Sequence, residues 1–71
     1  MSQQDAQYLL TIYWIDGGEV SEALISNQSM FELLRDVDSS QIKAFYKFTE
    51  IDGTQHRVNR YKINHIEITP Q

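Results

Sequence analysis

The chain has 71 residues, is 41% hydrophobic and carries a formal net charge of −4 at pH 7. A domain of this length buries only about 60% of the surface that its unfolded chain exposes, so its core is small. The absence of cysteine excludes a disulfide framework and a thiolate zinc site, and the negative charge argues against a general nucleic-acid binder.

Residues 1–7 are polar and lack hydrophobic periodicity, which is typical of a disordered tail; residues 1–71 are expected to form a single small domain. The tail has no basic segment ahead of an apolar core, as a signal peptide would have. No apolar run approaches the roughly 20 residues of a membrane span. We therefore expect a cytoplasmic protein that has no membrane partner.

Two strands are predicted at residues 8–15 and 19–25, joined by a turn at Asp16-Gly17-Gly18-Glu19. Every residue of the first is apolar or β-branched, as in a central strand that is covered on both faces. A turn at the two glycines pairs Ile15 with Val20. The helix side then carries Leu10, Ile12 and Trp14, and the opposite side carries Thr11, Tyr13, Ile15, Val20, Glu22 and Leu24.

A short helix follows a break in the strand pattern at residues 26–29. Ser29 and Glu32 have the spacing of a capping box, which predicts that the helix begins at Ser29. An apolar stripe at positions i, i+3, i+4 and i+7 gives the helix one face for packing: Met30, Leu33, Leu34 and Val37.

The turn Asp52-Gly53 predicts a hairpin across residues 42–63, because a type I′ turn favours these two residues. A two-residue loop pairs Ile51 with Thr54. It places Ile42, Ala44, Tyr46 and Phe48 on the core side, and on the other side Lys43, Phe45 and Lys47 with Val58, Arg60 and Lys62. The alternative is a three-residue loop with a bulge at Thr54, which shifts the pairing by one and scatters these cations between the faces.

The last segment contains a break in phase. Tyr61 and Ile63 share one parity, whereas Ile66 and Ile68 share the other. A bulge at Asn64-His65 would return both pairs to the core side, and Pro70 should end the pairing.

These elements predict an α+β fold of order β-β-α-β-β. One antiparallel sheet of four strands, with a short fifth strand as an alternative, carries the helix on one face. The face away from the helix would expose an apolar set: Tyr13, Ile15, Val20, Leu24, Phe45 and Val58. In a second arrangement the sheet curls into a small barrel that the helix plugs.

Catalytic chemistry is poorly supported by the residue pattern. There is no cysteine nucleophile, no Gly-rich phosphate loop and no spacing that singles out a Ser-His-Asp set, so we expect no enzymatic activity. The two histidines, His56 and His65, fall on opposite faces of the predicted hairpin unless the bulge turns His65 over. We expect neither a bound metal nor a cofactor.

An uncovered apolar face of this size predicts a small interaction module that forms a homodimer or docks on a protein partner through the open sheet face. The alternative is an accessory nucleic-acid binder, because residues 41–71 carry five bases against three acids. A solvated face whose lysines prevent aggregation is the plainest interpretation of those bases. The candidate binding residues are Tyr13, Lys43, Phe45, Lys47, Val58, Arg60 and Lys62.

Overall fold

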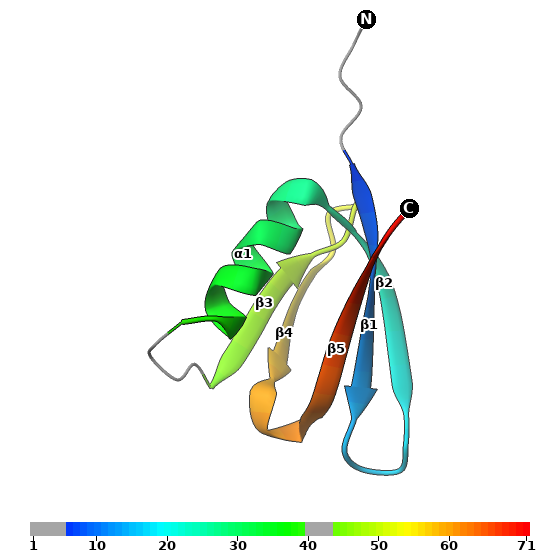
Figure 1. The fold of residues 1–71 in the computed structure, drawn as a ribbon, viewed down its shortest axis with the longest axis vertical. Helices are drawn as coiled ribbons and strands as arrows, with labels where there is room; N and C mark the ends of the chain where they lie inside the picture. The colour runs from blue at the N-terminus through cyan, green and yellow to red at the C-terminus, as the bar shows by residue number, and fades with distance from the viewer. Residues whose placement is uncertain (1–5, 40–43) are drawn as a thin grey trace, which may run out of the picture.

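The computed structural model describes residues 6–39 and 44–71 (Figure 1). The elements in chain order are β1 (Gln7–Trp14), β2 (Val20–Ser26), α1 (Asn27–Val37), β3 (Phe45–Thr49), β4 (Gln55–Asn59), the 3₁₀ turn η1 (Arg60–Lys62) and β5 (Ile63–Pro70). The α+β class, the antiparallel pairing and the single helix are confirmed. β1 begins at Gln7, and Met1 to Asp5 lie outside the described residues.

The strands form two sheets, so the prediction of one four-stranded sheet is wrong. A three-stranded sheet has the order β2-β1-β5, and β3 pairs with β4 in a separate hairpin. The 3₁₀ turn is the reason. The Asn59 side chain accepts the Tyr61 N–H at 2.9 Å, which turns the chain out of the hairpin after β4 and sends β5 to the free edge of β1.

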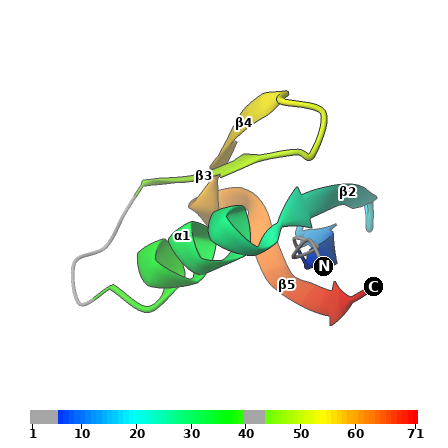
Figure 2. The same cartoon turned by 90° about the horizontal axis from the view of Figure 1, so that it is seen from above.

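α1 and the hairpin lie on the same side of the three-stranded sheet (Figure 2). The hairpin is tied to β2 by a single antiparallel bridge between Ile25 and Glu50 and by the Ile51 N–H, which donates to the Leu24 carbonyl at 3.0 Å. The space between these layers holds the core. Its buried apolar members are Leu10, Ile12, Ile25, Met30, Leu33, Tyr46 and Phe48.

The helix stripe is confirmed, but the predicted capping box is wrong. Ser26 is the N-cap, and its side chain accepts the Ser29 N–H at 3.1 Å. The buried hydroxyl of Ser29 instead accepts the Thr49 N–H at 2.9 Å. Because Ser26 is the cap, the helix begins at Asn27, earlier than predicted. Ser29 lies inside the helix and attaches α1 to β3. Met30 and Leu33 are buried, and the other members of the stripe pack against the core.

The β1–β2 pairing differs from the prediction by two residues. Tyr13 pairs with Val20, and the Trp14 N–H donates to the Glu19 carbonyl at 3.0 Å across a four-residue loop. Gly17 and Gly18 adopt φ of 72° and 65° in that loop. Because strand side chains alternate with a period of two, a shift of two leaves every side chain on its predicted face.

The Asp52-Gly53 hairpin has the three-residue loop, so the two-residue register is wrong. The Gly53 N–H donates to the Glu50 carbonyl at 2.9 Å, and the Glu50 N–H donates to the Thr54 carbonyl at 2.8 Å. Within this loop, Gly53 has a positive φ of 95° and Asp52 does not, whereas a type I′ turn requires a positive φ at both residues. The shift turns Val58 toward the core, to pair with Tyr46, and brings Arg57 opposite Lys47.

The predicted bulge is confirmed on β5. The register against β1 shifts between Tyr13, which pairs with His65, and Trp14, which pairs with Ile63, so Asn64 is the extra residue. Ile63, Ile66 and Ile68 consequently all pack against the core, whereas Tyr61 in the 3₁₀ turn is 63% exposed. Pro70 is the last residue of β5, and one further bond joins the Gln71 N–H to the Gln7 carbonyl at 3.0 Å.

Candidate functional site

The side of the three-stranded sheet away from α1 and the hairpin is the open face (Figure 2). Leu10 and Ile12 of β1 are buried on the core side, so the odd-numbered residues of β1 lie on the open face. Their partners in the two neighbouring strands share it. The open face comprises Leu9, Thr11, Tyr13, Val20, Glu22, Leu24, His65, Glu67 and Thr69.

The β2 half of the open face exposes two apolar side chains, one on either side of Glu22. Val20 is 51% exposed and Leu24 is 36% exposed, and Ile15 in the adjoining loop is 58% exposed. No element of the described residues packs on this side of β2 (Figure 2). Complete burial of an exposed aliphatic side chain is worth about 1.5–3 kcal/mol, and a complex would gain only the fraction of this that Val20 and Leu24 still expose.

The β5 half of the open face is a polar cluster around Tyr13. The Tyr13 ring stacks on His65, with 4.3 Å between centroids and planes 16° apart. Its hydroxyl donates to Glu67 Oε1 at 3.2 Å, and His65 Nε2 lies 3.5 Å from Glu67 Oε2. The Glu67 charge, followed by desolvation, the hydrogen bond to Glu67 and the Glu22 charge, raises the pKa of Tyr13 above its ordinary 10.0.

Two carboxylates flank the middle of the open face. Thr11 on the central strand pairs directly with Glu22 on β2 and with Glu67 on β5, and Thr11 itself is 7% exposed. Glu22 and Glu67 therefore lie on either side of the small, buried Thr11 side chain. The open face combines apolar groups with negative charge, so it fits a surface that is apolar and basic.

The outer face of the hairpin carries the basic residues that remain together. Phe45 is 44% exposed, and the Arg57 guanidinium lies 5.1 Å from the centre of its ring. Lys47 pairs directly with Arg57 across the strands. The two-residue loop would have placed Arg60 opposite Phe45, but Arg60 lies over Tyr61, at 5.3 Å. The one-residue change of register explains the exchange.

The seven predicted site residues therefore do not form one surface. Tyr13 lies on the open face, Phe45 and Lys47 lie on the outer face of the hairpin, and Val58 packs against the core. Arg60 and Lys62 belong to the 3₁₀ turn, and Lys43 lies outside the described residues.

Several residues of these surfaces are not among the predicted site residues. Arg57 follows from the three-residue loop, which is the alternative register of the hairpin. The bulge at Asn64 brings His65 and Glu67 onto the open face when β5 pairs with β1 instead of β4.

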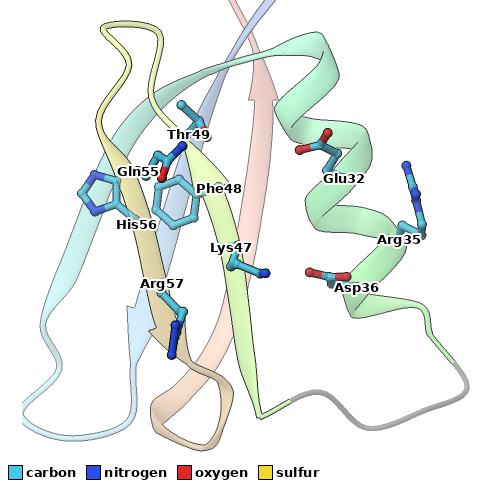
Figure 3. Close-up of a pocket in the computed structure, with 9 residues that line it drawn as sticks. All are labelled: Glu32, Arg35, Asp36, Lys47, Phe48, Thr49, Gln55, His56 and Arg57. Carbon is cyan, nitrogen blue, oxygen red and sulfur yellow. The ribbon is translucent and has the colours of Figure 1, made fainter.

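A groove of about 660 Å³ lies between α1 and the hairpin (Figure 3). In this view Asp36 on the helix and Lys47 on β3 point toward one another across it. His56 contacts the Glu50 carboxylate and stacks on Phe48, with ring centres 4.8 Å apart. The charges of the groove are of both signs, in contrast to the single sign expected of a phosphate or metal site. They are Glu32, Arg35, Asp36, Lys47 and Arg57.

The two histidines lie on different sheets, His56 on β4 and His65 on β5. Within residues 6–39 and 44–71, no group of three or more potential metal ligands comes together. In the same part of the chain, no helix has the length and apolar character needed to cross a membrane.

The chain was compared with protein-family models, with curated proteins and with solved structures, and none of the three comparisons finds a match. The function is therefore argued from the surfaces of the molecule.

Proposed function

We propose that this protein is a small, non-enzymatic interaction module that self-associates or docks on a protein partner through the open face. The observation that supports this most directly is the exposure of Val20, Leu24 and Ile15 together along β2 and its loop. Exposed apolar groups gathered on one sheet face are typical of a protein interface.

The charges of the open face favour a partner surface that is basic and apolar. Glu22 and Glu67 lie at either side of Thr11, so two open faces packed against one another would bring four carboxylates together. A basic and apolar surface avoids that repulsion. The outer face of the hairpin in a second copy has this composition, with Phe45, Lys47 and Arg57.

Such a contact joins two different surfaces of the chain. Contacts of this head-to-tail type leave one surface free at each end, so further copies can add. Self-association through the open face should therefore give a mass that continues to rise with concentration, rather than one that stops at a closed dimer.

Sedimentation velocity over a range of protein concentrations tests the proposal. Leu24→Glu places a charge in the apolar part of the face and should weaken association at least tenfold, which corresponds to about 1.4 kcal/mol. Phe31→Glu is the matched control, because Phe31 is 57% exposed on α1, away from the open face. If Leu24→Glu associates as the wild type does, the open face is not the interface.

The second candidate is an accessory nucleic-acid binder that uses the outer face of the hairpin. Its support is the arrangement of Arg57 over Phe45 with Lys47 opposite Arg57. The net charge of −4 and the position of Asp36 near Lys47 oppose it. Fluorescence anisotropy with an oligothymidylate of about 15 nucleotides decides between them: a nucleic-acid binder gives an affinity that falls steeply with salt and is lost in Lys47→Glu.

A further inference from the structure

The outer edge of β5 carries backbone groups that do not face β1. Gln71 donates to the Gln7 carbonyl, so residues 7 and 71 form a hydrogen-bonded pair. In an antiparallel ladder these pairs alternate, which assigns the β1 bonds to His65, Glu67 and Thr69. The backbone N–H and carbonyl groups of Ile66 and Ile68 therefore point outward. Pro70 occupies the next outward position, where its missing N–H costs nothing.

No other strand of the described residues pairs with β5 on that side, because the sheet order ends there (Figure 2). Natural edges are protected by bulges, prolines and charges directed inward. β5 has a bulge at Asn64 and a proline at position 70, and these lie at its two ends. The stretch between them, residues 65–69, is regular, rich in β-branched residues and free to pair.

We infer that β5 pairs with β5 of a second copy, antiparallel, with Ile66 opposite Ile66. Three symmetric registers use the outward groups. Glu67 opposite Glu67 brings like charges together, and Ile68 opposite Ile68 sets Ile66 against a proline that has no donor. Ile66 opposite Ile66 sets His65 of each copy against Glu67 of the other. This last register gives two cross-strand pairs of complementary chemistry on the open face.

The result is a closed dimer with a continuous six-stranded sheet. Paired residues in an antiparallel ladder point to the same face, so both open faces lie on one side and remain uncovered. The inference shares with the proposed function only the premise that the protein self-associates. It uses a different surface, so the two can fail separately.

Sedimentation velocity on variants that combine the two surfaces tests the inference. Leu24→Glu should stop at twice the mass of one chain, because the edge is intact. Leu24→Glu with Ile66→Pro should sediment as one chain, since the proline removes an outward donor and leaves the β1 ladder bonded. The matched control is Leu24→Glu with Glu22→Pro, which removes an outward donor from β2, the other edge, and should remain a dimer. Far-UV circular dichroism monitors folding in each variant.

The outcomes separate the two proposals. A Leu24→Glu protein that sediments as one chain overturns the edge pairing and leaves the open face standing. A wild type and a Leu24→Glu variant that both stop at the dimer remove the open face from self-association and support the edge. A wild type that is monomeric at every concentration overturns the edge pairing, as does a dimer that persists in the folded protein that carries both Leu24→Glu and Ile66→Pro.

Disulfide trapping tests the register without relying on a proline variant. The chain has no cysteine, so an introduced cysteine is its only thiol. When His65→Cys and Glu67→Cys proteins are mixed and mildly oxidised, the 65–67 disulfide should form fastest. These positions face one another about 4.5 Å apart between Cα atoms in a pair without hydrogen bonds. The other His65–Glu67 pair of that dimer stays native. Faster cross-linking of Glu67→Cys to itself would overturn this register.

Discussion

The hydroxyl oxygen of Ser29 accepts the backbone N–H of Thr49 at 2.9 Å, across 20 residues of chain. Ser29 is 4% exposed and Thr49 is half-buried, so this bond is partly shielded from water. It attaches the first turn of α1 to the last residue of β3. Among the described residues, a bridge and one backbone bond also join the hairpin to β2. The Ser29 hydroxyl thus adds to the packing of Tyr46 and Phe48 in holding the hairpin over the core.

Replacement of Ser29 by alanine should therefore destabilise the fold by about 1–3 kcal/mol, because the Thr49 N–H is left in a part-buried position without its acceptor. Urea denaturation followed by circular dichroism measures the change. Gln28→Ala, at the neighbouring exposed helix position, is the control and should change the free energy of unfolding by less than about 0.5 kcal/mol. A Ser29→Ala protein as stable as this control would show that the bond contributes nothing.

Gly53→Ala should destabilise the hairpin by about 1–2 kcal/mol. Gly53 has φ of 95°, which an L-residue with a Cβ rarely adopts, and a Cβ there would meet no atom within 4 Å. The cost is therefore in the backbone and not in packing. Gly53→Asn should recover part of the loss, because asparagine tolerates left-handed conformations better. Thermal denaturation gives the order of stability, and equal values for alanine and asparagine would contradict this account.

The Asp52 carboxylate should lose its stabilising role as the pH falls. The Thr54 backbone N–H, which donates to Asp52 Oδ1 at 2.9 Å, holds the pKa of Asp52 below its ordinary 3.8. Because the folded-state pKa is the lower one, the contribution is complete above pH 3.8 and is lost as pH falls through the folded value. NMR titration of the carboxyl carbon measures it. In Asp52→Asn, this part of the acid dependence of unfolding should disappear.

Tyr13 should ionise at a higher pH than a free tyrosine, because Glu67 and Glu22 oppose a negative phenolate. The raised folded-state pKa means that the stabilisation is complete below pH 10.0 and is lost as pH rises through the folded value. Absorbance at the phenolate band, with Tyr8, Tyr46 and Tyr61 replaced by phenylalanine, follows this single group. Glu67→Gln should lower the pKa of Tyr13, and no change would mean that Glu67 does not act on the phenol.

The sequence predicts side-chain faces better than it predicts strand pairing. Alternation in β1 and β2 placed Leu10, Ile12 and Trp14 on the core side even though the pairing was wrong by two residues. The helix stripe and the bulge at Asn64 were likewise visible as periodicity and as a break in it. These features depend only on residues that are close in sequence.

The errors come from choices between residues of equal propensity. Ser26 and Ser29 are both able to cap a helix, and only the proximity of Thr49 assigns Ser29 another role. Asp52-Gly53 fits a two-residue or a three-residue loop, and the difference is one φ angle. Asn59 has the appearance of an ordinary strand residue, yet its side chain starts the turn that separates the sheets. The predicted site residues of the hairpin fall on different surfaces because their common face depended on the two-residue loop at Asp52-Gly53.

The central strand has a further consequence for how the chain is made. β1 obtains half of its backbone partners from β5, and the outermost of these bonds joins residues 7 and 71. During synthesis from the N-terminus, β1 and β2 can form their hairpin early, but the odd-numbered positions of β1 have no partner until β5 has been made. Long-range closure of this kind slows folding, and an apolar strand with an open edge attracts other nascent chains in the meantime. Complete pairing of β1 therefore requires the chain from residue 7 through residue 71.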